Sequence, residues 1–175
     1  MFAINPAIGD SVMKPNFQRN FLFSIVVSLL FPAISLAVPI QWTIESGGNN
    51  HYYELILLDE PGLSWDDAKA EAELRDVLGF QGHLVTITSK EENLWLMQTF
   101  GDGELNFKWM GAYQPLREQA PVANVGWKWV TGEPFQYTNW APGEPNDFLG
   151  AEYVGMLWFT ASGPEGKPWN DVVSH

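Results

Sequence analysis

Residues 82–93 read GHLVTITSKEEN, and this stretch decides the fold. Its first part, residues 83–88, is rich in β-branched and apolar side chains, which predicts a short strand. A capping box follows, because Ser89 is followed three residues later by Glu92, and such a pair opens a helix. We expect that helix to continue to about Phe100. The stretch therefore predicts a strand that leads directly into a helix.

A similar pair of elements lies upstream. Residues 51–57, HYYELIL, are aromatic and apolar and predict a strand. Ser64 is a good helix N-cap, and the acidic residues that follow it favour the first turn of a helix. Apolar residues at helical spacing, ending with Leu74 and Leu78, predict that this helix runs to Leu78, where glycines end it.

Downstream of the second helix, short strands alternate with long loops. The strands are expected at residues 107–113, 126–130 and 152–158, and a segment rich in Pro, Gly and aromatic residues, 131–145, separates the last two. Irregular segments of this length in a compact domain are usually functional. The order strand, helix, strand, helix and then several strands indicates an α+β fold.

Composition excludes several classes of function. The chain has 175 residues, of which 46% are hydrophobic, which suits one folded domain with a targeting segment. Its formal net charge of −12 excludes binding to nucleic acid by bulk electrostatics, which needs clustered Lys and Arg. It has no cysteine, which excludes disulfides, zinc–thiolate sites and a cysteine nucleophile.

The N-terminal region has the three parts of a secretory signal peptide. Basic residues precede an uncharged run at 21–31, FLFSIVVSLLF, and small residues lead to Ala37. We expect a signal peptide within about 14–37, with cleavage after Ala37. The chain then divides into an N-terminal extension with the signal peptide, 1–37, and a domain, 38–175. The protein is expected to be secreted, extracellular or periplasmic, with no stable membrane span after cleavage. The alternative is an uncleaved membrane anchor, although the run is shorter than the roughly 20 residues that a span needs.

Oxygen-bearing side chains gather in the second half of the chain. The set comprises three carboxylates and two amides: Glu144, Asn146, Glu152, Asn170 and Asp171. Ca²⁺ takes about 6–8 oxygen ligands and mixes carboxylates with carbonyl oxygens, so this set predicts a calcium site. The spacing alone leaves open the alternative of a solvated acidic loop.

Several separate motifs, in order, make the chain resemble the C-type lectin-like domain family over nearly all of residues 38–175. They are HYYEL at 51–55, SWDDAK at 64–69, the stretch 82–93, WMG at 109–111, WVTGEP at 129–134, YTNW at 137–140, EPN at 144–146 and WND at 169–171. The resemblance implies a C-type lectin-like fold with two helices, antiparallel sheets and a long-loop region. Trp109, Trp129, Trp140 and Trp169 would be framework residues, and Pro145 would follow a cis peptide bond.

The resemblance also implies a ligand. In calcium-dependent members of the family, one Ca²⁺ is held by positions that correspond to Glu144, Asn146, Glu152, Asn170 and Asp171, and the same side chains hydrogen-bond two neighbouring hydroxyls of a sugar. The order Glu-Pro-Asn implies a preference for mannose, glucose, N-acetylglucosamine or fucose-type sugars. We expect affinity at one site to be weak, about millimolar or about −4 kcal/mol.

The chain departs from the family in two ways. The positions of the family's disulfides are Ala72, Val154 and Ser174 here, and apolar packing is expected to replace the bridges. The chain also ends at His175, shortly after the WND motif, so we expect the family's closing strand to be absent from it. We expect the first strand to keep an unpaired edge because the sequence is truncated; the alternative is a partner strand supplied from elsewhere.

Three functions compete. The leading prediction is an exported, calcium-dependent module that binds a glycan or glycoconjugate and is not an enzyme. The alternative is a C-type lectin-like domain that binds protein and uses Ca²⁺ only to order its loops. A glycosidase with Glu144 and Glu152 as its paired carboxylates is the third, but metal ligation would keep both ionised, so neither could donate a proton. His51, His83 and His175 form no recognisable catalytic motif.

Overall fold

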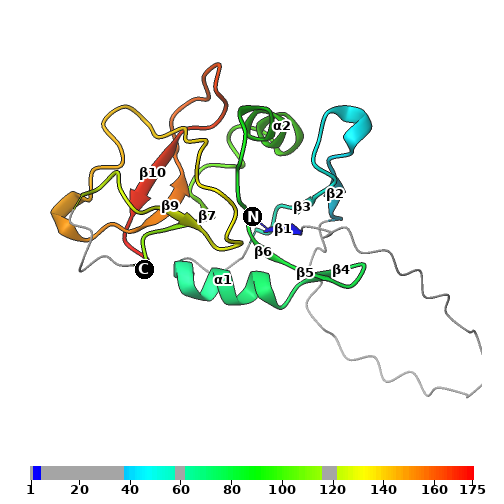
Figure 1. Cartoon of the computed structure of the whole chain (residues 1–175), viewed down its shortest axis with the longest axis horizontal. Coiled ribbons are helices and arrows are strands. Elements are labelled where there is room, and N and C mark those ends of the chain that lie inside the picture. The colour runs from blue at the N-terminus through cyan, green and yellow to red at the C-terminus, as the bar shows by residue number, and fades with distance from the viewer. Residues whose placement is uncertain (1, 5–37, 58–61, 116–121) are drawn as a thin grey trace, which may run out of the picture.

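The computed structural model describes residues 2–4, 38–57, 62–115 and 122–175 (Figure 1). The predicted α+β class is confirmed, because two α-helices accompany antiparallel sheets. In Figure 1, α1 (Trp65–Glu73) runs along the lower side of the molecule and α2 (Lys90–Phe100) lies at the upper side. Among the described residues, no helix is long and apolar enough to cross a membrane. The predicted signal peptide lies outside the described residues.

The first sheet contains an unexpected strand. Its order is β2 (Ile40–Gln41), β3 (Tyr52–Glu54), β1 (Phe2–Ile4) and β6 (His83–Leu84), and every neighbouring pair is antiparallel.

β1 lies between β3 and β6, with Ala3 opposite both Tyr53 and His83. The prediction that the first strand keeps an unpaired edge is therefore wrong, because residues from the start of the chain supply the partner strand. Cleavage after Ala37 would separate β1 from the rest of the domain.

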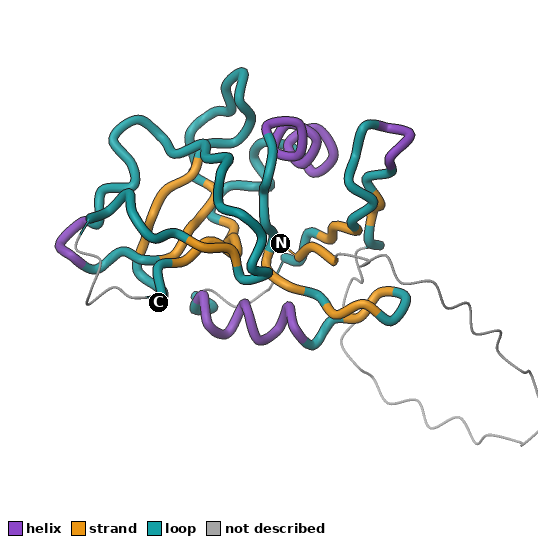
Figure 2. Tube along the Cα trace, in the orientation of Figure 1, coloured by secondary structure: helices purple, strands orange, loops and turns teal. Residues whose placement is uncertain are grey.

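The second sheet carries the predicted ligand residues of the WND motif. Its order is β10 (Trp169–Val172), β9 (Val154–Leu157), β7 (Lys108–Tyr113) and β8 (Lys128–Trp129). The pairing places Asp171 opposite Gly155. The three strands predicted downstream of α2 are confirmed with shorter bounds. Figure 2 shows that loop makes up most of the chain between β8 and β9, interrupted by the 3-10 helix η2 (Phe148–Gly150).

Both helices begin as the sequence predicts. The Ser64 side chain accepts a hydrogen bond from the Asp67 backbone N–H, and Ser89 does the same for Glu92. α2 also ends at the expected residue. A short 3-10 helix, η1 (Ile44–Ser46), links β2 to β3.

The prediction that α1 extends to Leu78 is wrong. The helix ends at Glu73, and a small hairpin of β4 (Asp76–Val77) and β5 (Phe80–Gln81) follows. Leu78 and Gly79 form its two-residue turn with positive φ angles of 57° and 87°, as the favoured hairpin turns require. Leu78 is 75% exposed rather than packed. A hairpin turn therefore interrupts the apolar spacing that suggested a longer helix.

The core is aromatic and has two parts. The larger part includes Trp129 and Trp169, whose ring centroids lie 5.8 Å apart in an edge-to-face arrangement. The smaller part packs α1 against the sheets and includes Ala72 and Val154. Ala72, Val154 and Ser174 are 0%, 1% and 8% exposed, so the positions that carry disulfides in the family are filled by buried side chains. The expectation of packing in place of bridges is thus confirmed for Ala72 and Val154.

Candidate functional site

The long loop and β10 together carry the five predicted calcium ligands. Glu144 and Asn146 precede η2, Glu152 follows it, and Asn170 and Asp171 lie in β10. The peptide bond between Glu144 and Pro145 is cis, as the resemblance implied.

Asp171 joins the loop to the strand. This side chain is fully buried; its Oδ1 accepts the backbone N–H of Asn146 at 2.9 Å and its Oδ2 accepts that of Asp147 at 2.7 Å. The backbone repeats this connection, because the Ala141 N–H donates to the Trp169 carbonyl. The structure thus brings the EPN and WND motifs together, although 25 residues separate Asn146 from Asp171.

Glu152 closes the other side of the group. Its Oε2 accepts the Phe148 backbone N–H at 2.9 Å, and its own backbone N–H donates to Asp147 Oδ1 at 3.1 Å. Asp147 adopts a left-handed backbone conformation with φ 48°. Asp147 was not among the predicted ligands, although its position directly after the EPN motif was an available signal. It adds a fourth carboxylate to this region.

The carboxyl groups of Glu144 and Glu152 have raised pKa values. Burial, a hydrogen bond with Asp171 and the charges of Asp171 and Glu152 raise the pKa of Glu144 to about 7. Burial also raises the pKa of Glu152, and the charges of Asp171 and Asp147 add to this. Negative groups this close favour either a proton or a cation between them.

Two of the predicted ligand atoms have no hydrogen-bond partner. Glu144 Oε2 and Asn170 Oδ1 are buried and unpaired. A buried polar atom without a partner costs about 1–3 kcal/mol, so each of these oxygens needs an explanation. A hard cation that binds oxygen would satisfy both.

The donor types fit Ca²⁺, but their present spacing is not that of a metal cluster. Among the described residues, no three His, Cys, Asp or Glu side chains are grouped so that they could hold a metal ion. Both oxygens of Asp171 accept a backbone N–H. A cation bound by Asp171 would share these oxygens with the two backbone N–H groups.

A buried lysine fixes the approach to β10. Lys167 is fully buried, and its Nζ donates to Asp102 Oδ1 at 3.0 Å, Asn106 Oδ1 at 2.7 Å and the Thr160 carbonyl at 2.9 Å. Its carbonyl accepts from the side-chain amides of Asn93 and Asn139, at 2.9 Å each. These bonds tie the loop before the WND motif to α2 and to the long loop. Sequence reasoning missed Lys167, since nothing local distinguishes it from a surface lysine.

The chain is similar to several known proteins. The chain is 31% identical over 158 residues to halomucin from Haloquadratum walsbyi. The matched region covers 79% of this chain and 2% of halomucin. It is 38% identical over 109 residues to the C-type lectin lectoxin-Lio1 from Erythrolamprus poecilogyrus, covering 61% of this chain and 59% of that protein. It is 28% identical over 137 residues to human C-type lectin domain family 10 member A, covering 77% and 36% respectively. The chain thus spans less than two thirds of these relatives.

Among solved structures, the C-type lectin CEL-I from Cucumaria echinata matches with a TM-score of 0.51 and 25% identity, covering 63% of this chain and 75% of that chain. No family model matches the chain.

Proposed function

The chain contains a C-type lectin-like domain, and from that premise we propose that it is a calcium-dependent carbohydrate-binding module. The relatives include C-type lectins, which supports membership of a carbohydrate-binding lectin family. Dependence on Ca²⁺, the sugar preference and export from the cell are the finer parts of the proposal. The observation that carries it is the pair of unpaired buried oxygens, Glu144 Oε2 and Asn170 Oδ1, which belong to two of the five expected ligand residues.

The proposed metal ligands are the side chains of Glu144, Asn146, Glu152, Asn170 and Asp171. When bound, Ca²⁺ would supply coordination positions for two neighbouring hydroxyls of a sugar. The carboxylates of Glu144 and Glu152 would accept hydrogen bonds from those hydroxyls, while the amides of Asn146 and Asn170 would donate to them. The sugar would therefore be recognised by paired acceptors and donors around one cation.

The order of groups in the EPN motif supports a sugar preference. It is the order that the resemblance associates with mannose, glucose, N-acetylglucosamine and fucose-type sugars. We propose no catalytic step, because Glu144 and Glu152, if they ligate the cation, stay ionised and donate no proton. A protein ligand with a purely structural Ca²⁺ remains the alternative, and competition by free monosaccharide separates the two.

The direct test is Ca²⁺ titration of the full chain by calorimetry, with melting curves in calcium and in EGTA. We expect binding of one Ca²⁺, a higher melting temperature in calcium, and mannan binding that methyl α-mannoside displaces. Glu144→Gln should lose all three effects, whereas Glu71→Gln, on the exposed surface of α1, should keep them. A melting temperature that millimolar Ca²⁺ leaves unmoved would reject the metal site. Calcium binding without displacement by the monosaccharide would favour the protein ligand.

A further inference from the structure

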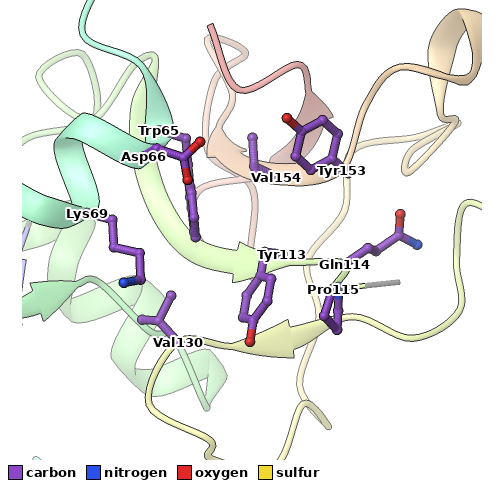
Figure 3. Close-up of a pocket in the computed structure, with 9 residues that line it drawn as sticks. All are labelled: Trp65, Asp66, Lys69, Tyr113, Gln114, Pro115, Val130, Tyr153 and Val154. Atoms are coloured by element: carbon purple, nitrogen blue, oxygen red, sulfur yellow. The ribbon is translucent and has the colours of Figure 1, made fainter. Parts of the chain in front are cut away.

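A pocket lies between α1 and the second sheet, away from the proposed calcium ligands. This pocket has a volume of about 410 Å³, within the range of about 300–1,000 Å³ that is usual for small-molecule sites. Figure 3 shows the ring of Tyr113 in its middle, with side chains of α1 on one side and of the β9 region on the other. Its lining includes none of the five proposed calcium ligands, although Tyr153 and Val154 directly follow Glu152.

The floor of the pocket is apolar and partly aromatic. The rings of Trp65 and Tyr113 have centroids 5.8 Å apart, and Val130 and Val154 complete the floor. Trp65 is held in place, because it is 5% exposed and its indole N–H donates to the Met110 carbonyl at 2.8 Å. The floor is therefore a fixed surface, with Tyr113 half-buried and available for a ring to stack on it.

The rim of the pocket is polar and carries charges of both signs. Asp66 and Lys69 lie three residues apart on α1, so both side chains project from the same helix face. One is an acceptor and the other a donor, and Lys69 is also paired with Glu73. A ligand with a large net charge would meet one attractive and one repulsive group, which disfavours both anions and cations. A neutral ligand with several hydroxyls can use both groups at once.

A pyranose ring matches this division of the pocket, because one face of it presents C–H groups and its edge presents hydroxyls. We propose that this pocket is a second, calcium-independent binding site for a neutral sugar residue. The sugar ring lies on Tyr113, and its hydroxyls reach Asp66 and Lys69. The choice of a sugar as the ligand rests on the proposed lectin function. The shape and charge of the pocket are observed independently of that function.

The test measures binding of mannotriose to the full chain by two-dimensional NMR, once in millimolar Ca²⁺ and once in EGTA. In EGTA we expect the calcium site to bind no sugar. The indole N–H signal of Trp65 should still shift when the trisaccharide is added. Asp66→Ala and Lys69→Ala should each weaken this residual binding by about tenfold. The control Glu71→Ala, exposed on the same helix but outside the pocket, should leave it unchanged.

Tyr113→Leu provides a second variant, which keeps an apolar floor but removes the ring. It should abolish the residual binding while the melting curve shows that the protein is still folded. No shift of the Trp65 signal in EGTA, or a shift that persists in Asp66→Ala and Lys69→Ala, overturns the second site. Failure of the proposed function appears separately, as the absence of EGTA-sensitive binding in both the wild-type protein and the pocket variants.

Discussion

Replacing Lys167 with methionine tests whether a single buried ammonium orders the approach to the site. The substitution keeps most of the side-chain volume but removes three hydrogen bonds, to Asp102, Asn106 and the Thr160 carbonyl. Hydrogen bonds that involve a charged group contribute about 1.5–3 kcal/mol each. Simple addition overstates the loss, because the wild-type protein also bears the desolvation penalty of a fully buried ammonium.

The expected loss in the free energy of unfolding is therefore about 2–4 kcal/mol. We expect a loss in the lower part of this range, because the side chain of Asp102 is 43% exposed. Water can therefore hydrate its carboxylate when the ammonium of Lys167 is removed. For a chain of this size, about 2–4 kcal/mol lowers the melting temperature by about 5–15 °C. Thermal unfolding followed by circular dichroism measures this directly.

Lys90→Met is the matched control. Lys90 also pairs with a carboxylate, that of Glu165 at 2.7 Å, but its side chain is 40% exposed. An exposed pair contributes about 0–1 kcal/mol, so this variant should melt within about 3 °C of the wild-type protein. Hydrogen exchange should also quicken at residues 159–168 in Lys167→Met and not in the control. Equal melting temperatures of the two variants would refute the reasoning that burial makes Lys167 important.

Other predictions follow from the first sheet and the close contacts in the core. A chain of residues 38–175 lacks β1, so thermal melting should show lower stability than for the full chain, and a peptide of residues 1–8 added in trans should restore part of the difference. Burial lowers the pKa of His51 and His83, so the unfolded chain takes up protons below about pH 6.5 before the folded protein does. Urea titrations should therefore show that the loss of unfolding free energy between pH 7 and 5 is smaller in His51→Gln than in the wild-type protein, and an equal loss would contradict this. A Cβ at Gly111 would lie 2.7 Å from Val130 Cγ2 and 3.0 Å from the Leu84 carbonyl oxygen, so Gly111→Ala should lose about 1–3 kcal/mol in the same assay. Gly103→Ala, with open space around it, is its control.

Local patterns of the sequence predicted the elements that local interactions determine. Ser64 and Ser89 start helices because a hydroxyl three residues before a backbone N–H can cap it without help from the rest of the chain. The predicted end of α1 was wrong, because the spacing of the apolar residues Leu74 and Leu78 fits a longer helix as well as it fits the hairpin that forms. The two-residue turn at Leu78–Gly79, which pairs β4 with β5, replaced the last turn of that helix.

The candidate site divides in the same way. The resemblance supplied the five ligand types, and the structure placed Asn146 and Asp171 in hydrogen-bond contact across a long loop. The sequence did not reveal that Asp147 joins them or that Lys167 supports the loop. Lys167 acts through partners distant in the sequence, which leave no periodic or spacing signal, whereas Asp147 lies directly beside the EPN motif.

The sequence by itself determined the class of the domain, its two helix starts and the oxygen donors of the proposed calcium site, because each is written in adjacent residues or in short motifs. Only the tertiary structure decided that Phe2–Ile4 pairs with both β3 and β6, that the Lys167 ammonium is buried among three acceptors, and that a second pocket opens beside α1. Pairing, burial and concavity depend on which segments meet in space. The chain must fold before those contacts exist, so they cannot be read from neighbouring residues alone.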